Sequence, residues 1–330
     1  MKNALGESRR APINDIVTQG GPLGGSLCSV TVDSIGKEAL LSNDKNDDEY
    51  VYSYHDVKIP PLSMVDDVLT ISKCGPNSIV TNAFINAKFE QKRLELNKSK
   101  CHQIHIGKTN KRCPELKTHD DVMMKSKDDK YVGDILSKDG KINKTIKSRA
   151  MKGMGIISTI MNILKEVNLG NFHFETGLLL RESLFLSSML VNSETWVNIA
   201  KEEIEIMESL DRILMRRILE IPTSTPKPSL YLELGVIPIG YIIKSRRLLF
   251  LQYILKRNKE ETISKAFWAQ RANPVKNDWC LQVDKDLKDF KLDHFSLDQI
   301  EKISKNLFKK FVKDASPKKK RKKERKKKKN

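Results

Sequence analysis

The sequence predicts an α+β protein in which a mixed first part is followed by an almost entirely helical second part. Runs rich in valine, tyrosine and isoleucine, typical of short strands, lie before about residue 140. From Ile142 onward the apolar residues recur at helical spacing instead. With 330 residues, the chain is long enough for a large core in about one to three domains.

In the first part we expect a helix over 27–41, strands over 50–58 and 62–72, a helix over 76–96, and strands over 101–106 and 131–136. Pro76 suits the first turn of its helix, which Asn97 ends. The Asp66-Asp67 pair interrupts an apolar run, which predicts two short strands that meet in a tight turn. A further turn is expected at Asp139-Gly140.

In the second part we expect a helix from about residue 142 to 164, further helices over 175–196, 202–221 and 242–255, a proline-rich joint over 222–228, and weaker helices over 260–316. The predicted organisation is an α+β unit over 1–140, a helical region over 141–258, a helical extension over 259–316 and a disordered basic tail over 317–330.

The charge balance indicates a polyanionic partner. The net charge is +18, and residues 317–330 hold nine lysines, two arginines and one glutamate, which leaves +8 for the remainder. A basic body with a very basic tail is most often found in proteins that bind nucleic acid, and less often in those that bind an acidic membrane surface. The alternative is that surface lysines only keep the protein soluble.

The cysteines and the apolar runs limit the cellular compartments in which the protein is expected. Five cysteines, an odd number, without a Cys-x-x-Cys pair indicate free thiols in a reducing compartment. Cys101, His105 and Cys113 fit no zinc spacing, so we interpret them as structural. No signal peptide is visible, and the most apolar stretch, residues 178–191, is too short and too charged to span a membrane.

Two motifs, which follow one another in the sequence, indicate a site for a nucleotide and a metal ion. Residues 19–25 form a glycine-rich turn, which lets backbone approach a nucleotide without interference from Cβ atoms. Asp66 and Asp67 at a hairpin tip present the carboxylates that Mg²⁺ prefers when it also binds phosphate. Each motif alone is weak, since most Asp-Asp pairs are solvated turn residues and glycines make ordinary turns.

Two further segments fit the same chemistry. Lys100 follows a predicted helix and opens a strand, where it could meet a triphosphate or protonate a pyrophosphate leaving group. Gly133 lies in the predicted strand before the Asp139-Gly140 turn, which could hold a primer end. The alternatives are a solvent-exposed lysine and a plain strand.

Together these four segments resemble the reverse transcriptase of non-LTR (LINE-type) retrotransposons. The resemblance continues through residues 178–181, 193–196, 216–219 and 230–235 and covers about residues 15–258. It implies a polymerase palm, an antiparallel sheet with helices, followed by a helical thumb. It also implies RNA-directed DNA synthesis by two-metal nucleotidyl transfer, with an RNA template and a DNA primer or target as partners.

The resemblance also assigns roles to residues. Asp66 and Asp67 would bind Mg²⁺, with Mn²⁺ as an alternative, Lys100 would lie by the triphosphate, and Gly133 would lie near the primer terminus. The residues expected to line the incoming nucleotide and template are Gln19, Gly20, Gly21 and Pro22.

The sequence departs from the family in one important respect. The resemblance implies basic fingers and a third metal-binding aspartate on a strand before the glycine turn, yet only eighteen residues precede Gln19. We therefore expect a truncated element, comprising the rear half of a palm, a thumb and an extension, without catalysis by this chain alone. The alternatives are a non-catalytic nucleic-acid-binding protein and a decaying retroelement relic.

The basic tail resembles a monopartite nuclear import signal. The residues concerned are Lys318, Lys319, Lys320, Arg321, Lys322 and Lys323. This predicts a nuclear import receptor as partner and a nuclear location after synthesis and RNA binding in the cytoplasm. The alternatives are a nucleic-acid-binding arm, whose affinity would fall steeply with salt, and low-complexity sequence gained by read-through.

Overall fold

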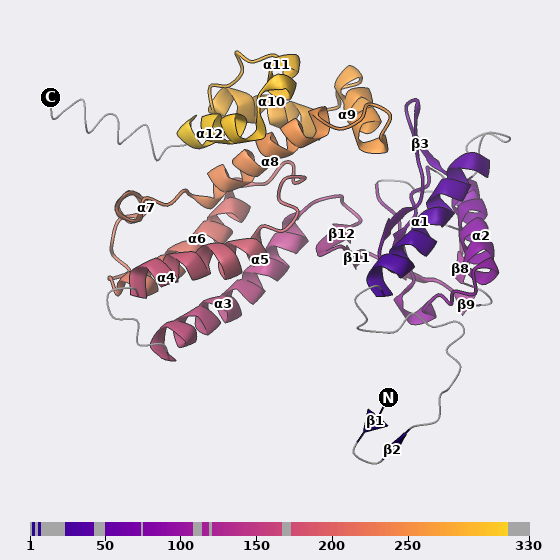
Figure 1. Cartoon of the computed structure of the whole chain (residues 1–330), viewed down its shortest axis with the longest axis horizontal. Coiled ribbons are helices and arrows are strands. Elements are labelled where there is room, and N and C mark those ends of the chain that lie inside the picture. Colours follow the sequence, from indigo (N-terminus) through magenta and orange to yellow (C-terminus); the bar gives the residue numbers. More distant parts are fainter. Residues whose placement is uncertain are drawn as a thin grey trace. The chain divides into compact units, whose positions relative to one another are not determined.

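The computed structural model describes residues 2–3, 6–7, 24–42, 50–73, 75–107, 114–118, 121–166 and 173–315. In this part of the chain helices predominate and the strands form small two-stranded ladders (Figure 1), so the predicted mixture of helices and small sheets is confirmed. The chain divides into two compact units, Met1–Ser126 and Lys127–Asn330, which are described separately. The boundary between the units lies earlier than the predicted change of character at residue 140, because the hairpin of residues 128–137 belongs to the helical unit.

The first unit combines two helices with short strand pairs. Its elements are β1 (Lys2–Asn3), β2 (Gly6–Glu7), α1 (Gly24–Ser42), β3 (Tyr52–Tyr54), β4 (Val57–Ile59), β5 (Leu62–Met64), β6 (Asp67–Leu69), α2 (Gly75–Gln91), the 3-10 turn η1 (Lys98–Lys100), β7 (His102–Ile104), β8 (Lys117–Thr118), β9 (Asp121–Val122) and β10 (Met124–Ser126). Pairs β1–β2, β3–β4, β5–β6 and β8–β9 are antiparallel, and β7–β10 is parallel. Among the described residues these ladders do not join into one larger antiparallel sheet.

The core of the first unit lies between α1 and α2. Val32 and Ile35 of α1 contact Ile85 and Phe89 of α2, and all four are at least nine-tenths buried. The prediction that the second helix extends to residue 96 was wrong. It ends at Gln91 because Arg93 adopts a left-handed φ of 55°, and the Leu94 N–H then donates to the Phe89 carbonyl at 2.8 Å.

The second unit begins with a hairpin and continues as helices. Its elements are β11 (Asp128–Tyr131), β12 (Asp134–Ser137), α3 (Asn143–Glu166), α4 (His173–Leu180), the π-helix η3 (Arg181–Leu186), α5 (Ser187–Met189), α6 (Lys201–Leu219), α7 (Lys227–Leu234), α8 (Ile239–Leu255), α9 (Thr262–Ala272), α10 (Trp279–Asp289), α11 (Leu297–Lys302) and α12 (Lys305–Ala315). The predicted helix over 175–196 is interrupted by the π-helical turn and ends near Met189.

A buried ion pair fixes the π-helix against α6. The Arg181 guanidinium donates through Nε and Nη2 to both carboxylate oxygens of Asp211, at 2.6 and 2.7 Å. Arg181 is 2% exposed and Asp211 is fully buried. The two parallel, charge-assisted hydrogen bonds make this a strong ion pair. Removing one partner would leave the other as an uncompensated buried charge.

Helix α8 belongs to two apolar cores. Its Ile239 and Ile243 lie in the cluster formed with α3, the π-helix and α6, while Leu248 and Leu251 lie in the cluster formed with α9–α12. Figure 1 shows α9–α12 gathered around the second half of α8. The predicted extension over 259–316 therefore shares its core with the preceding helices through α8.

The thiol of Cys280 on α10 offers a chemical test of this second core. Cys280 is buried, and burial raises the pKa of its thiol to about 12. Because the thiolate is the reactive form, we expect Cys280 to resist iodoacetamide at mildly alkaline pH, whereas the half-buried Cys28 and Cys101 are alkylated. Peptide mass spectrometry measures this, with urea-unfolded chain as the control. Alkylation of Cys280 as fast as Cys101 in the folded chain would contradict the expectation.

Candidate functional site

The predicted hairpin around Asp66-Asp67 is present in the first unit. Strands β5 and β6 pair from Leu62↔Leu69 to Met64↔Asp67, which leaves Val65 and Asp66 as a two-residue turn. Asp66 and Asp67 are exposed, and neither side chain forms a hydrogen bond or ion pair with another described residue. The hairpin therefore presents two adjacent carboxylates whose oxygens are available to an external cation.

The turn is strained at Val65. Val65 has a φ of 61°, and a β-branched residue rarely adopts this left-handed conformation. Such conformations cost roughly 1–3 kcal/mol and persist where surrounding structure imposes them, often at functional sites. This strain could not be predicted from the residue type, because valine is an ordinary strand residue and reveals nothing of the turn conformation.

Helix α1 runs along this hairpin. A Cβ added at Gly36 would lie 3.1 Å from the Pro61 carbonyl, the Ser63 hydroxyl donates to Asp33 Oδ1, and the Cys28 thiol lies 3.7 Å from the Val65 carbonyl. Successive positions toward the start of α1 thus meet successive positions toward the hairpin tip. The start of α1 at Gly24, which overlaps the last residues of the predicted glycine turn in the sequence, is consequently at the same end as Asp66.

The two faces of the hairpin have different surroundings. Val68, paired with Ser63, packs against the core of α1 and α2. Met64, paired with Asp67 on the opposite face, is 54% exposed. Because side chains alternate along a strand, Asp67 lies on the face turned away from the core. The contacts of Asp33 and Cys28 with the hairpin were not predicted, since they join residues thirty or more positions apart.

The available donors suit a hard cation. Mg²⁺ commonly binds one or two carboxylates together with water and substrate phosphates, so Asp66 and Asp67 fit such a site. Within the described residues no group of three or more His, Cys, Asp or Glu side chains is placed to hold a metal ion. The two carboxylates alone would therefore supply only part of a metal's ligand set, and water, phosphate oxygens or another residue would have to complete it.

The other predicted site residues are not gathered here by any described contact. Lys100 is exposed at the end of η1. Gly133 is in the second unit, and the prediction of a continuous strand through it was wrong, because Val132 and Gly133 form a hairpin turn with φ values of 46° and 87°. The residues that lie outside the described part of the chain are Gln19, Gly20, Gly21 and Pro22, and the tail residues Lys318, Lys319, Lys320, Arg321, Lys322 and Lys323.

The Gly133 turn is held firmly within the helical unit. Arg149 of α3 donates through Nη2 to the Gly133 carbonyl at 3.2 Å and to Asp134 Oδ1 at 2.6 Å, and its guanidinium stacks on Trp196. Asn192 donates to the Val132 carbonyl at 2.8 Å. These contacts fix the position of the turn relative to α3.

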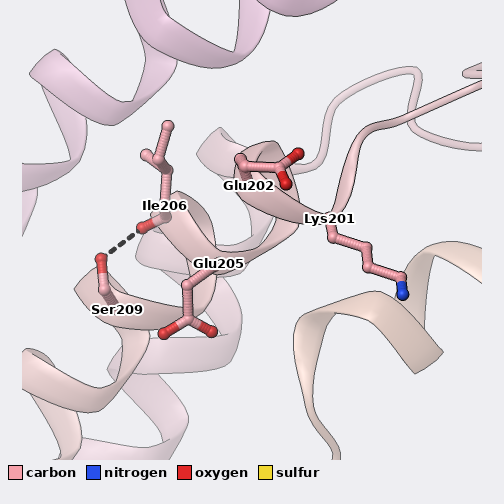
Figure 2. A pocket seen from close by; sticks show the side chains of 5 residues that line it. All are labelled: Lys201, Glu202, Glu205, Ile206 and Ser209. Carbon is pink, nitrogen blue, oxygen red and sulfur yellow. Dashed lines mark hydrogen bonds between the residues drawn. The ribbon is translucent and has the colours of Figure 1, made fainter.

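A shallow depression on α6 in the second unit carries further charged groups. Figure 2 shows its lining residues, Lys201, Glu202, Glu205, Ile206 and Ser209. The Ser209 hydroxyl donates to the Ile206 carbonyl, and Glu205 pairs with both Arg212 and Lys227. The hydrogen bond from Lys227 lowers the pKa of Glu205. Glu205 is thus engaged in joining α6 to α7, so this depression is a weaker candidate than the hairpin.

The chain matches none of the family models, curated proteins or solved structures with which it was compared. In the part of the chain that the structure describes, no helix has an apolar stretch long enough to cross a membrane. Functional assignment therefore depends on the geometry of the hairpin and on the sequence motifs.

Proposed function

We propose that the chain contains the metal-binding hairpin and thumb region of an RNA-directed DNA polymerase of the non-LTR retrotransposon type. The observation that carries this proposal is the alignment of α1 with the β5–β6 hairpin, which brings the start of α1 to the end that bears Asp66. The described start of α1, from Gly24 onward, and the hairpin tip are separated in sequence but lie at the same end of one local structure.

In this proposal Asp66 and Asp67 hold Mg²⁺, or Mn²⁺ in its place. When bound, the metal would stabilise charge on phosphate oxygens during nucleotidyl transfer. The chain's own contribution is to keep the two carboxylates adjacent, exposed and free of competing lysines or arginines among the described residues. Lys100 and Gly133 keep their proposed roles at the triphosphate and the primer terminus.

Metal binding at the hairpin tests the proposal directly. We expect Asp66→Asn or Asp67→Asn to weaken Mn²⁺ binding by about tenfold or more, equivalent to roughly 1.4 kcal/mol, because each removes an anionic ligand. Electron paramagnetic resonance of free Mn²⁺ measures the affinity. The matched control is Asp56→Asn, since Asp56 is exposed in the similar turn after His55, whose φ is 51°.

The control decides how the result is interpreted. Equal losses in the Asp56 and Asp66 variants would indicate general attraction to surface carboxylates and would contradict the proposal. A loss confined to Asp66 and Asp67 supports it, and incorporation of nucleotide on an RNA template with a DNA primer can then be assayed. Any incorporation is expected to disappear in the Asp66 variant and to persist in the Asp56 variant.

The second candidate function is nucleic-acid binding without catalysis. It is favoured by the net charge of +18, of which +8 lies outside residues 317–330. Template–primer binding that persists in EDTA and in Asp66→Asn, without metal binding at the hairpin, would favour this candidate.

A further inference from the structure

Helix α12 presents a fixed face to solvent because its other face is built into the core. Phe308 is fully buried, Val312 is 2% exposed, and both lie in the cluster with α8. Phe311 stacks on Phe295 with ring centroids 5.6 Å apart. The orientation of α12 about its own axis is thereby set by packing.

The junction between α11 and α12 is also attached to α8. The Gln252 side-chain amide donates to the carbonyls of Ile300 and Ile303, both at 3.0 Å, and Gln252 is 2% exposed. The Lys256 ammonium donates to the Ile303 carbonyl at 2.7 Å. The side chains that point outward from this corner are consequently held on a rigid support.

The outward side chains of this corner include four lysines, beside the exposed Asn306 and Leu307. Lys302 of α11 and Lys305, Lys309 and Lys310 of α12, here called the basic face, are all exposed, and none forms an ion pair with a described residue. Lys305 and Lys309 are four residues apart, or about 6 Å along the helix. On neighbouring helices, by contrast, Lys244 pairs with Asp289, and Arg271 pairs with Asp284.

The sequence that follows extends this charge. Residues 317–330 carry nine lysines, two arginines and one glutamate. A concentration of unpaired positive charge costs free energy by self-repulsion, which a polyanion relieves. Duplex DNA carries one charge per about 1.7 Å of its axis, so a helix of the length of α12, about 16 Å, can face several phosphates.

We propose that the basic face binds the phosphate backbone of a nucleic-acid duplex. A membrane surface fits less well, because amphipathic helices bind membranes by inserting their apolar face. In α12 that face includes Phe308 and Val312, which are already buried in the core. The proposal assigns a role to the helices after α8 and does not depend on metal binding at the Asp66-Asp67 hairpin.

A charge-matched comparison in the full chain tests this proposal. The test variant carries Lys305→Gln, Lys309→Gln and Lys310→Gln. The control carries Lys276→Gln, Lys285→Gln and Lys288→Gln, three exposed lysines of the same unit. Fluorescence anisotropy of a labelled DNA duplex in EDTA gives the association constant at several KCl concentrations, and thermal unfolding checks that both variants are folded.

The expected result is a change in salt dependence. Loss of three phosphate contacts should make the slope of log K against log salt less steep by about 2.7, whereas the control keeps the parent slope. Equal changes in both variants would overturn the proposal in favour of net charge alone. An unchanged slope in the test variant would also overturn it, and so would a selective loss of binding to phosphatidylserine vesicles.

The hairpin proposal can fail independently. Because EDTA removes divalent cations, Asp66→Asn is expected to leave the slope unchanged in this assay. The predicted slope change without Mn²⁺ binding at the hairpin would support the basic-face proposal and contradict the polymerase proposal. Mn²⁺ binding at the hairpin without the predicted slope change would support the polymerase proposal and contradict the basic-face proposal.

Discussion

Replacement of Asp211 by alanine is expected to lower the free energy of unfolding of the helical unit by about 3–5 kcal/mol. The change leaves the Arg181 guanidinium, which is 2% exposed, without its carboxylate partner between the π-helix and α6. Urea unfolding followed by far-ultraviolet circular dichroism measures the difference. A loss below about 1 kcal/mol would mean that water or another group replaces the carboxylate.

The control for this prediction is a solvent-exposed ion pair in the same unit. Arg271 and Asp284 form an ion pair between α9 and α10 at 2.9 Å, but both side chains are about one-third exposed. Exposed pairs contribute at most about 1 kcal/mol, so Asp284→Ala should have a small effect. The comparison separates the cost of a buried uncompensated charge from the loss of an ion pair in general.

Replacement of Phe185 by alanine is expected to cost about 3–5 kcal/mol, because it removes a fully buried ring and leaves a cavity. Phe185 lies in the cluster with Met189 and Leu210, against the closely packed Gly153. Leu184→Ala is the matched control, since Leu184 is the preceding residue of the same π-helix and is 39% exposed. Similar losses for the two variants in urea unfolding would contradict the assigned register of the π-helix.

The local patterns predicted most of the helices and the hairpin at Asp66-Asp67. Apolar residues at helical spacing mark α1, α3 and α6, and the carboxylate pair between apolar runs marks the turn between β5 and β6. These features depend on neighbours within one or two turns of the chain, which is the range over which hydrophobic periodicity is informative.

The features that were missed depend on contacts between distant residues. The turn at Val132 and Gly133 lies in an otherwise continuous strand-like run, and its conformation is held by Arg149 and Asn192 from elsewhere. The alignment of α1 with the hairpin likewise depends on the close approach of Gly36 to Pro61. No local period in the sequence encodes such contacts, so the site's surroundings could not be predicted.

The membership of α8 in two cores has a consequence for shortened products of this chain. A product that ends after residue 258 would keep all of α8 but would lose the partners of Leu248, Leu251 and Leu255. Each large apolar side chain left in water costs about 1.5–3 kcal/mol relative to its burial, a substantial fraction of the stability of an ordinary domain. A frameshift or protease cut at that point would therefore leave α8 with an exposed apolar face on the remaining helical region and direct the product toward aggregation or degradation.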